Sequence, residues 1–227
     1  MFVELSYPIG PATTVLDPGI RPPQVVPRSR FADGKRNNTS YIEMFAHTGT
    51  HIDMPWHFNP QGKKVMDFPI EAFVFTQVIV LQIPKEPRQP VTVEELLPHQ
   101  QALAAADAVL IRTGNSQVRQ SDPEAYLRGI PGLSLPAAQY LAGMRQLRCI
   151  GVDFLSIENL EQARPANYPV HHALLDRPEA IFLLEDANFE PLSSTPPIER
   201  LYLFPLRIEE LEASPVTAVA EIRSGTN

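Results

Sequence analysis

The sequence predicts an α/β fold, in which a single domain of 227 residues has a mixed β-sheet core and flanking helices. In the central part of the chain, helical patterns alternate with short apolar runs rich in β-branched residues, as in sheets whose parallel strands are joined through helices. Both ends of the chain are rich in predicted strands, which favours additional antiparallel pairing. No internal repeat or linker interrupts the chain, so we expect one domain over residues 1–227.

The predicted strands are short apolar runs bounded by turn residues. They begin near residues 2, 41, 76, 108, 149, 180, 201 and 216, with the sequences FVEL, YIEMFA, TQVIVLQI, AVLIRT, CIGVD, AIFLLE, LYLFPLRI and VTAVAEI. Three helical patterns lie among them. The first follows Thr92, and Glu95 stands at the spacing of a capping box, whereas Pro98 should interrupt the helix. An amphipathic helix is predicted from Leu135, and a single short helix near Pro169.

Composition excludes several classes of protein. Hydrophobic residues make up 44% of the chain and charged residues 20%, which is typical of a globular domain. The net charge of −7, without a basic stripe, argues against a nucleic-acid partner. We find no apolar run of about 20 residues that could span a membrane, and no basic and apolar leader typical of a signal peptide. The single cysteine, Cys149, excludes an internal disulfide, is expected to be buried, and fits a cytoplasmic protein.

The segment HTGTHIDMPWHF, residues 47–58, contains three of the six histidines. His47, His51, Asp53 and His57 would share one face of an extended chain, because side chains alternate between faces. In a flat strand His47 and His51 would lie roughly 13 Å apart, whereas nitrogen ligands of one zinc ion lie within roughly 4 Å of each other. We therefore expect a bend at Gly49. A helix with both histidines on one turn is disfavoured by the glycine, threonines and proline of the segment. Four donor side chains in eleven residues predict a metal site.

This segment resembles the HxGTHxDxPxHF motif of the cyclase family, which includes bacterial kynurenine formamidases and isatin hydrolases. The resemblance covers most of the chain. It extends through blocks in the family's order: TSYIEMFAHTGTHIDMPWHFNPQG, VLIRTG, IGVDFLSIE, VHHALLDRPEAIFLLE and SPVTAVAEI. It implies a swivelling β/β/α-type fold and a metal-dependent amidohydrolase similar to the arylformamidases.

The resemblance also implies a site for two metal ions. In this sequence its ligands fall on His47 and His51 for one ion, on Asp53 as the bridge, and on His171 and Glu185 for the second. Glu185 ends an apolar strand, where a buried carboxylate requires a cation. Imidazole and carboxylate ligands suit Zn²⁺, and Mn²⁺ is the alternative.

Two neighbouring residues are weaker candidates for the metal site. We expect His172 to cap the short helix or to face solvent, and Asp186 to be a solvated loop residue. The spacing from His171 to Glu185 is two residues longer than expected for formamidases, and an insertion around LDRPEA accounts for it.

His57 corresponds to the general acid/base of the family. The expected reaction is hydrolysis of a C–N amide bond of a small molecule, an aryl formamide or a lactam. Hydroxide formed on the metal at neutral pH would attack the carbonyl, and His57 would protonate the leaving nitrogen. The sequence leaves open a cyclase or dehydratase, a lactone hydrolase on the same metal site, and a non-catalytic metal- or ligand-binding protein.

The expected substrate pocket departs from that of the formamidases. Those enzymes stack an aromatic residue, which precedes a Pro-Gly-Asp turn, on the substrate. In the matching stretch, TTVLDPGI, Leu16 stands at the aromatic position and the turn reads Asp17-Pro18-Gly19. Leucine lines an apolar pocket but cannot stack, so the natural substrate stays open. Four residues are expected to line the pocket: Leu16, Trp56, Phe154 and Ser156. Asp153 is expected to orient a metal ligand.

The expected partners are a small-molecule substrate and further copies of the chain. Family members are usually homodimers or homotetramers, so the resemblance implies a homo-oligomer. Within the first 30 residues, the proline-rich segment from Pro11 to Pro27 would form either an arm that reaches a neighbour or a loop folded over its own active site.

Overall fold

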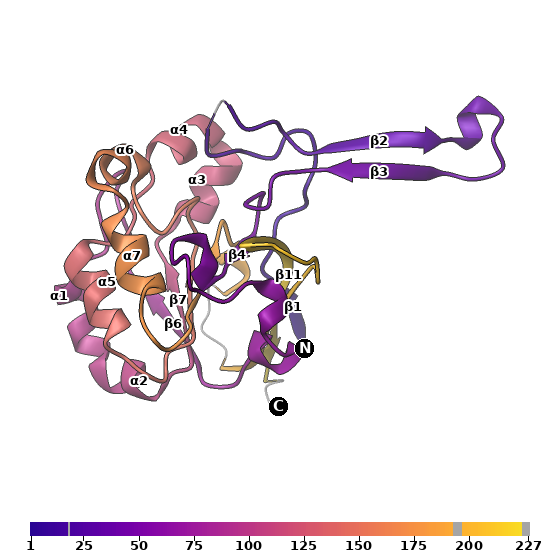
Figure 1. Cartoon of the computed structure of the whole chain (residues 1–227). Helices are drawn as coiled ribbons and strands as arrows, with labels where there is room; N and C mark the ends of the chain where they lie inside the picture. The colour runs from indigo at the N-terminus through magenta and orange to yellow at the C-terminus, as the bar shows by residue number, and fades with distance from the viewer. Residues whose placement is uncertain (18, 193–196, 224–227) are drawn as a thin grey trace.

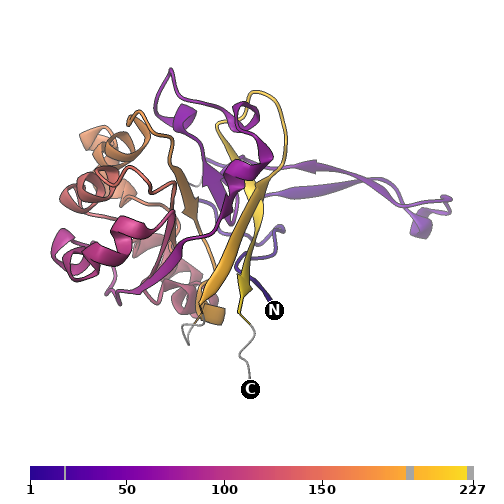
Figure 2. The same ribbon diagram turned by 90° about the horizontal axis from the view of Figure 1, so that it is seen from below.

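The computed structural model describes residues 1–17, 19–192 and 197–223. Among these residues, nine strands form one curved mixed sheet, and a separate two-stranded hairpin extends away from the helices (Figure 1). Seen at right angles, the helices lie on one side of the sheet and the hairpin points to the opposite side (Figure 2). This is the single α/β domain that the alternating pattern predicted.

The strands of the main sheet follow the order β5-β10-β11-β4-β9-β8-β7-β6, and β1 pairs with β11. Their bounds are β1 Phe2–Glu4, β4 His51–Asp53, β5 Val74–Phe75, β6 Val78–Gln82, β7 Ala108–Arg112, β8 Cys149–Val152, β9 Phe182–Glu185, β10 Ile198–Pro205 and β11 Ala213–Ile222. Pairing is parallel from β6 to β9 and antiparallel elsewhere. Because only residues 76–77 separate β5 from β6, the chain connects the two ends of this order, and the sheet approaches a barrel.

The helices cover the parallel half of the sheet. They are α1 Val93–Leu96, α2 Gln100–Ala105, α3 Asn115–Ser121, α4 Pro123–Arg128, α5 Leu135–Ala142, α6 Leu160–Ala163 and α7 Pro169–Leu175. The predicted capping box is confirmed, because the backbone N–H of Thr92 donates to Glu95 at 2.9 Å. Pro98 interrupts the helix as predicted: a 3₁₀ turn over Leu97–His99 separates α1 from α2. In the described part of the chain, no helix is long and apolar enough to span a membrane.

The apolar core has two parts, one on each face of the sheet. Along β7, Val109 and Ile111 pack under the helices, whereas Ala108 and Leu110 face the inside of the curved sheet, as the alternation of strand side chains requires. Cys149 is buried in the inner part, as predicted, and burial raises the pKa of its thiol.

Several elements differ from the sequence-based expectation. The proline-rich QVVPRS forms β2 Gln24–Ser29, which pairs with β3 Thr39–Glu43 in the projecting hairpin. The helices α3, α4 and α6 were not expected, because each has fewer than eight residues and too few apolar positions to form a periodic pattern. The first 30 residues therefore contribute to three structures: β1 in the sheet, a loop, and β2 of the hairpin. Pro18 lies outside the described residues.

Candidate metal centre

The bend predicted in the histidine motif is present. Gly49 has φ of +61°, a left-handed conformation that other residues rarely adopt. Beyond it the chain enters β4, so His47 folds back toward His51, and their ring centroids lie 5.1 Å apart. The glycine thus brings together two side chains that an extended chain would separate.

The pairing of β4 places a carboxylate opposite a histidine. β4 lies between β11 and β9, and His51 is the antiparallel partner of Glu185 at the end of β9. Directly opposed residues share one face of a sheet, and His51 Nε2 lies 3.5 Å from Glu185 Oε2. Together with Asp53, these side chains are at most 2% exposed. A residue from the motif and one 134 positions later therefore meet in a buried environment.

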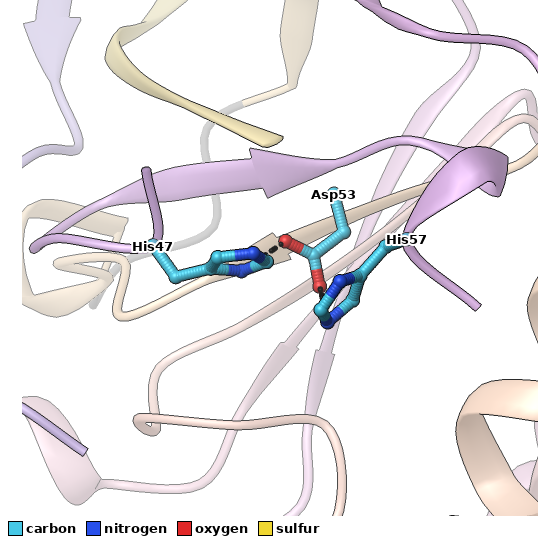
Figure 3. A group of neighbouring side chains, drawn as sticks. All are labelled: His47, Asp53 and His57. Carbon is cyan, nitrogen blue, oxygen red and sulfur yellow. Dashed lines mark ion pairs between the residues drawn. The ribbon is translucent and has the colours of Figure 1, made fainter. Parts of the chain in front are cut away.

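Asp53 occupies the centre of the cluster. His47 Nδ1 lies 2.9 Å from Asp53 Oδ1, and His51 Nε2 lies 3.4 Å from the same oxygen. On the other side, His57 Nε2 lies 3.9 Å from Asp53 Oδ2. Figure 3 shows the Asp53 carboxylate between the rings of His47 and His57. One carboxylate therefore faces imidazoles in two directions.

His171 approaches the cluster from α7 and is oriented by a carboxylate that sequence reasoning missed. Its Nδ1 donates to Glu158 Oε2 at 2.8 Å, and the Glu158 carboxylate also accepts the backbone N–H groups of Val170 and His171. This leaves Nε2 of His171 facing Glu185, 3.9 Å from Oε1. A histidine held at one nitrogen by a carboxylate, with the other nitrogen free, is a common arrangement for a metal ligand.

His51 and His47 are likewise held at one ring nitrogen. His51 Nδ1 donates to the carbonyl of Gly49 at 2.8 Å, which directs Nε2 toward Asp53. His47 Nε2 lies 3.3 Å from Glu212 Oε1, which leaves Nδ1 for Asp53. Glu212 was also missed, because it lies 165 residues after His47 and no local pattern connects them.

The side chains of the cluster fit a bound cation. His51 Nε2 and Asp53 Oδ2 are buried and have no hydrogen-bond partner within the described residues, and Asp53 Oδ1 has only its ion pair with His47, an arrangement that is costly unless a ligand satisfies these atoms. Two triads bring donor atoms within 4.8 Å of one another: His47, Asp53 and His57, and His51, Asp53 and Glu185. Zinc bonds of about 2.0–2.2 Å to nitrogen and oxygen are compatible with that spacing. His171 lies beside these triads, and its role as a ligand stays a prediction.

The electrostatics of the cluster also require positive charge. Burial raises the pKa of Glu185 well above its ordinary value, and the nearby Asp53 carboxylate raises it further. Burial lowers the pKa of His47, but Asp53 and then Glu212 raise it more strongly, to about 10. Without a metal, a proton on His47 thus provides the charge that a cation would supply.

His57 lies at the edge of the cluster, in a 3₁₀ turn over Pro55–His57. Burial lowers the pKa of His57 to about 4, which outweighs the opposite effect of Asp53. Its ring is partly exposed and packs edge-on against Phe58, whose ring in turn stacks on His171. His57 is therefore a neutral imidazole at neutral pH.

A cavity of about 250 Å³ opens beside the cluster. Its polar side comprises His47, Asp53, His57, His171 and Glu185, and its apolar side comprises Leu16, Ile20, Phe45, Phe58, Leu160 and Tyr168. Arg164 also lines it, and its guanidinium is paired with Asp17 at 2.7 Å. The loop that contains Leu16 and Asp17 therefore folds over the site of its own chain.

Two of the four residues expected in the pocket line this cavity, Leu16 and Ser156. Phe154 is fully buried in the core under the helices, so the expectation for it is corrected. Trp56 is corrected as well: it is not among the described residues that line the cavity, and its ring packs under Lys64 Nζ, 4.3 Å from the ring centroid. Neighbours in sequence point to opposite sides of a short turn, so proximity to His57 did not place Trp56 in the site.

Three further expectations concerned residues near the ligands. Asp153 accepts hydrogen bonds from Thr113 and from the backbone of Gly114, so it holds the turn after β7, and within the described residues it accepts none from a candidate metal ligand. Asp186 is fully buried, which corrects the expectation of a solvated residue: Arg119 donates two hydrogen bonds to its carboxylate. His172 is partly exposed near the end of α7, where its Nδ1 lies 2.9 Å from Asp176, in line with the expectation.

Fold and donor set together define an α/β protein with a buried cluster of metal-ligand side chains beside a largely apolar cavity. A family model described as "Putative cyclase" matches residues 3–159. The chain belongs to this cyclase family.

Similar proteins agree with the assignment to the cyclase family. A kynurenine formamidase of Geobacillus thermodenitrificans is 32% identical over 203 residues, which cover 88% of each chain. Isatin hydrolase A of Labrenzia aggregata, bound to benzyl benzoate, superimposes with a TM-score of 0.81 at 24% identity over 97% of this chain and 93% of that one. An isatin hydrolase bound to the product analogue thioisatinate gives 0.81 at 20% identity, over 96% and 91% of the chains. These two likenesses show that the fold is shared.

Proposed function

We propose that this protein is a metal-dependent hydrolase that cleaves the C–N amide bond of a small, largely apolar molecule. The observation that carries the proposal is the position of Asp53. Its Oδ2 has no hydrogen-bond partner among the described residues, its Oδ1 has only the ion pair with His47, and the carboxylate belongs to both groups of donors. A buried carboxylate so placed is suited to bridging two cations.

The residues that would hold the metal are those of the motif and of the strand opposite. His47, His51 and Asp53 would hold one ion, and Asp53, His171 and Glu185 the other. Zn²⁺ is the ion we propose, with Mn²⁺ as the alternative, because imidazole nitrogens and carboxylate oxygens suit both. Such ions, when bound, polarise a carbonyl group and make water a stronger nucleophile at neutral pH.

His57 is the proposed proton-transfer group. Because burial lowers its pKa to about 4, it is neutral at pH 7 and its free nitrogen accepts a proton from the attacking water. Once protonated, it donates that proton to the departing nitrogen. His57 lies 3.9 Å from Asp53 and lines the cavity, so a molecule bound in the cavity would lie beside its ring.

The lining of the cavity favours a substrate that is largely apolar or aromatic. Its wall opposite the metal ligands is formed by aliphatic and aromatic side chains, and Arg164 is already paired with Asp17. Leu16 provides contact area but no stacking surface. An aryl formamide is the first candidate, because the relative that is 32% identical is a kynurenine formamidase, and a lactam is the second, because the fold is that of isatin hydrolases.

We place the protein in the cytoplasm, where a free buried thiol such as that of Cys149 stays reduced.

The test is a substrate panel with purified protein. Formanilides, N-formylkynurenine and isatin are incubated with the protein as purified, after chelation, and after addition of Zn²⁺ or Mn²⁺. We expect hydrolysis of at least one amide, its loss on chelation, and its recovery with metal. Bound metal without hydrolysis of any amide on the panel would contradict the proposal.

The role of His57 has a matched control in the same protein. We expect His57→Ala to lower kcat by about 10²–10⁴-fold while the bound metal is retained. His172→Ala changes a partly exposed histidine close to the site and should leave kcat within about twofold. Full activity of His57→Ala would exclude it as the acid/base.

A further inference from the structure

A second cavity lies next to the cavity that opens beside the metal cluster. Its volume is about 180 Å³, and residues of α4 and α6 line it. These two helices lie at the same end of the helical layer (Figure 1). Leu16, Leu160 and Arg164 line both the metal cavity and this α4–α6 cavity. The two cavities therefore meet at these three side chains.

The wall of the α4–α6 cavity is largely apolar. Leu127 of α4 and Ile130 in the segment after it face Leu16 and Leu160 across this space. The three leucines are partly buried and pack against the core under the helices, and Ile130 is 4% exposed. Asn159 also lines the cavity, but its side-chain N–H group donates to the carbonyl of Ile130 at 2.8 Å and its side-chain oxygen caps α6. The lining thus offers apolar contact, and its amide side chain is already satisfied.

The charged side chains of this lining are exposed, and each is already paired with an opposite charge. The ion pairs are Arg128 with Glu124, Glu161 with Arg88, and Arg164 with Asp17, at 2.7, 3.0 and 2.7 Å. A charged ligand would have to displace one of these partners, whereas an uncharged ligand leaves all three pairs in place. The cavity therefore favours an uncharged, apolar group.

The junction between the cavities consists of two leucine side chains and an exposed ion pair. Asp17 and Arg164 join the loop of Leu16 to the start of the 3₁₀ turn after α6, and an ion pair so exposed contributes little to stability. Small-molecule sites typically have about 300–1,000 Å³. The cavities of about 250 and 180 Å³ are each smaller than that, but they reach this range once joined.

We propose that the α4–α6 cavity is a second subsite for the substrate and takes an uncharged apolar substituent on the ring of an aryl amide. The reacting amide would lie at the metal ligands and His57, and the ring against the apolar wall of the metal cavity. The substituent would pass between Leu16 and Leu160 into the α4–α6 cavity. The proposal rests on the proposed function, because it places the reacting amide at the metal cluster.

A series of ring-substituted probes tests the subsite. Anilines with a methyl, ethyl, propyl or butyl group in the para position are titrated into the metal-loaded protein by calorimetry, and the corresponding formanilides are assayed by steady-state kinetics. We expect Kd to fall, and kcat/KM to rise, about fourfold for each added methylene group, as for burial of a CH₂ group. A chain of the same length as butyl that ends in a carboxylate should bind more weakly than butyl.

Two variants and a control locate the effect. Leu127→Gln puts an amide into the α4–α6 cavity, and Leu16→Trp fills the junction. Each should reduce the ratio of the methyl to the butyl Kd at least about tenfold. Leu97→Gln changes an exposed leucine in the 3₁₀ turn after α1 and should leave this ratio unchanged. Circular dichroism and metal analysis check that the variants are folded and loaded.

The outcomes separate the subsite from the proposed function. Equal affinity for the methyl and butyl anilines, or an undiminished gain in both variants, would overturn the subsite, even where formanilide itself is hydrolysed. The gain in binding without hydrolysis of any formanilide would support the subsite and contradict the proposed function alone. Tighter binding of the carboxylate than of butyl would overturn the assignment of an uncharged substituent.

Discussion

The strand β4 and the β2–β3 hairpin are separated by only a few residues in sequence, yet their surroundings are opposite. All three residues of β4 are buried, and each has a partner on β9 and on β11. The strands of the hairpin have no fully buried residue and only each other as neighbours. Between them the chain passes Phe45, His47 and the bend at Gly49, and so turns from the projecting hairpin into the centre of the sheet.

The two regions also differ in the side chains that they contain. The donors around β4 are held by the sheet, and the buried oxygens of Asp53 make no hydrogen bond within the described residues. The hairpin has a defined register, and its apolar side chains are exposed. The first region therefore concentrates buried polar atoms, and the second exposes apolar surface. The two should therefore respond to different perturbations.

The largest effect is expected at the centre of the metal cluster. Asp53→Asn removes the charge that both triads share, so we expect loss of bound metal and a fall in kcat/KM of at least about 10³-fold. Metal analysis and steady-state kinetics measure this. Asp33→Asn, at the tip of the hairpin, is the matched control and should leave both values unchanged. Retention of stoichiometric metal in Asp53→Asn would show that the bridging role is wrong.

Metal removal should affect the two regions unequally. A ligand that binds only the folded state at about 1,000 times its dissociation constant contributes about 4 kcal/mol to stability, so chelation should lower Tm by about 8–16 °C. Calorimetry with and without Zn²⁺ measures this shift. In hydrogen exchange, the amides of β4 should lose protection on chelation while those of the hairpin do not change. Equal loss of amide protection in β4 and in the hairpin would contradict the expectation that the metal stabilises β4 alone.

A smaller effect is expected for the carboxylate that orients His171. Glu158→Gln keeps the size of the side chain but removes the charge that its imidazole partner faces, and we expect metal affinity to fall about 10–100-fold. Competition with a chromogenic chelator gives the affinity. Glu161→Gln, on an exposed position of α6, is the control and should have no effect. Unchanged affinity in Glu158→Gln would mean that α7 alone positions His171.

The smallest effect compares two isoleucines. Ile52→Val in β4 removes a fully buried methyl group and should lower the free energy of unfolding by about 0.5–1.5 kcal/mol. Ile42→Val in the hairpin should change it by less than about 0.5 kcal/mol, because Ile42 is 68% exposed. Urea denaturation measures both. A cost at Ile42 as large as that at Ile52 would contradict the expected difference between the two regions.

Much of the fold was predictable because its signals are local. The capping box of Thr92 and Glu95, the interruption at Pro98 and the bend at Gly49 depend on residues within one turn of each other. The apolar runs of β7 to β9 were equally clear, since strands buried on both faces need continuous hydrophobic side chains. The short helices α3, α4 and α6 and the strand β2 lacked such signals.

The site was predictable only in part. The motif identified His47, His51, Asp53 and His57, and the structure brings these four together. Trp56 shows that a sequence neighbour of a site residue need not lie in the site, because the turn that directs His57 toward the cavity directs the indole toward Lys64. Phe154 was placed in the pocket because it follows a strand, but its side chain fills the core instead.

The sequence by itself determined the class of fold, the donor set of the motif and the bend that gathers it, because these follow from the chemistry and conformational limits of residues close in the chain. Only the tertiary structure decided that His51 lies opposite Glu185, that Glu158 and Glu212 hold the imidazoles, and that Asp186 is paired with Arg119. Strand register and buried ion pairs join residues 13 to 165 positions apart. They are set by the packing of the whole domain, which no local pattern encodes.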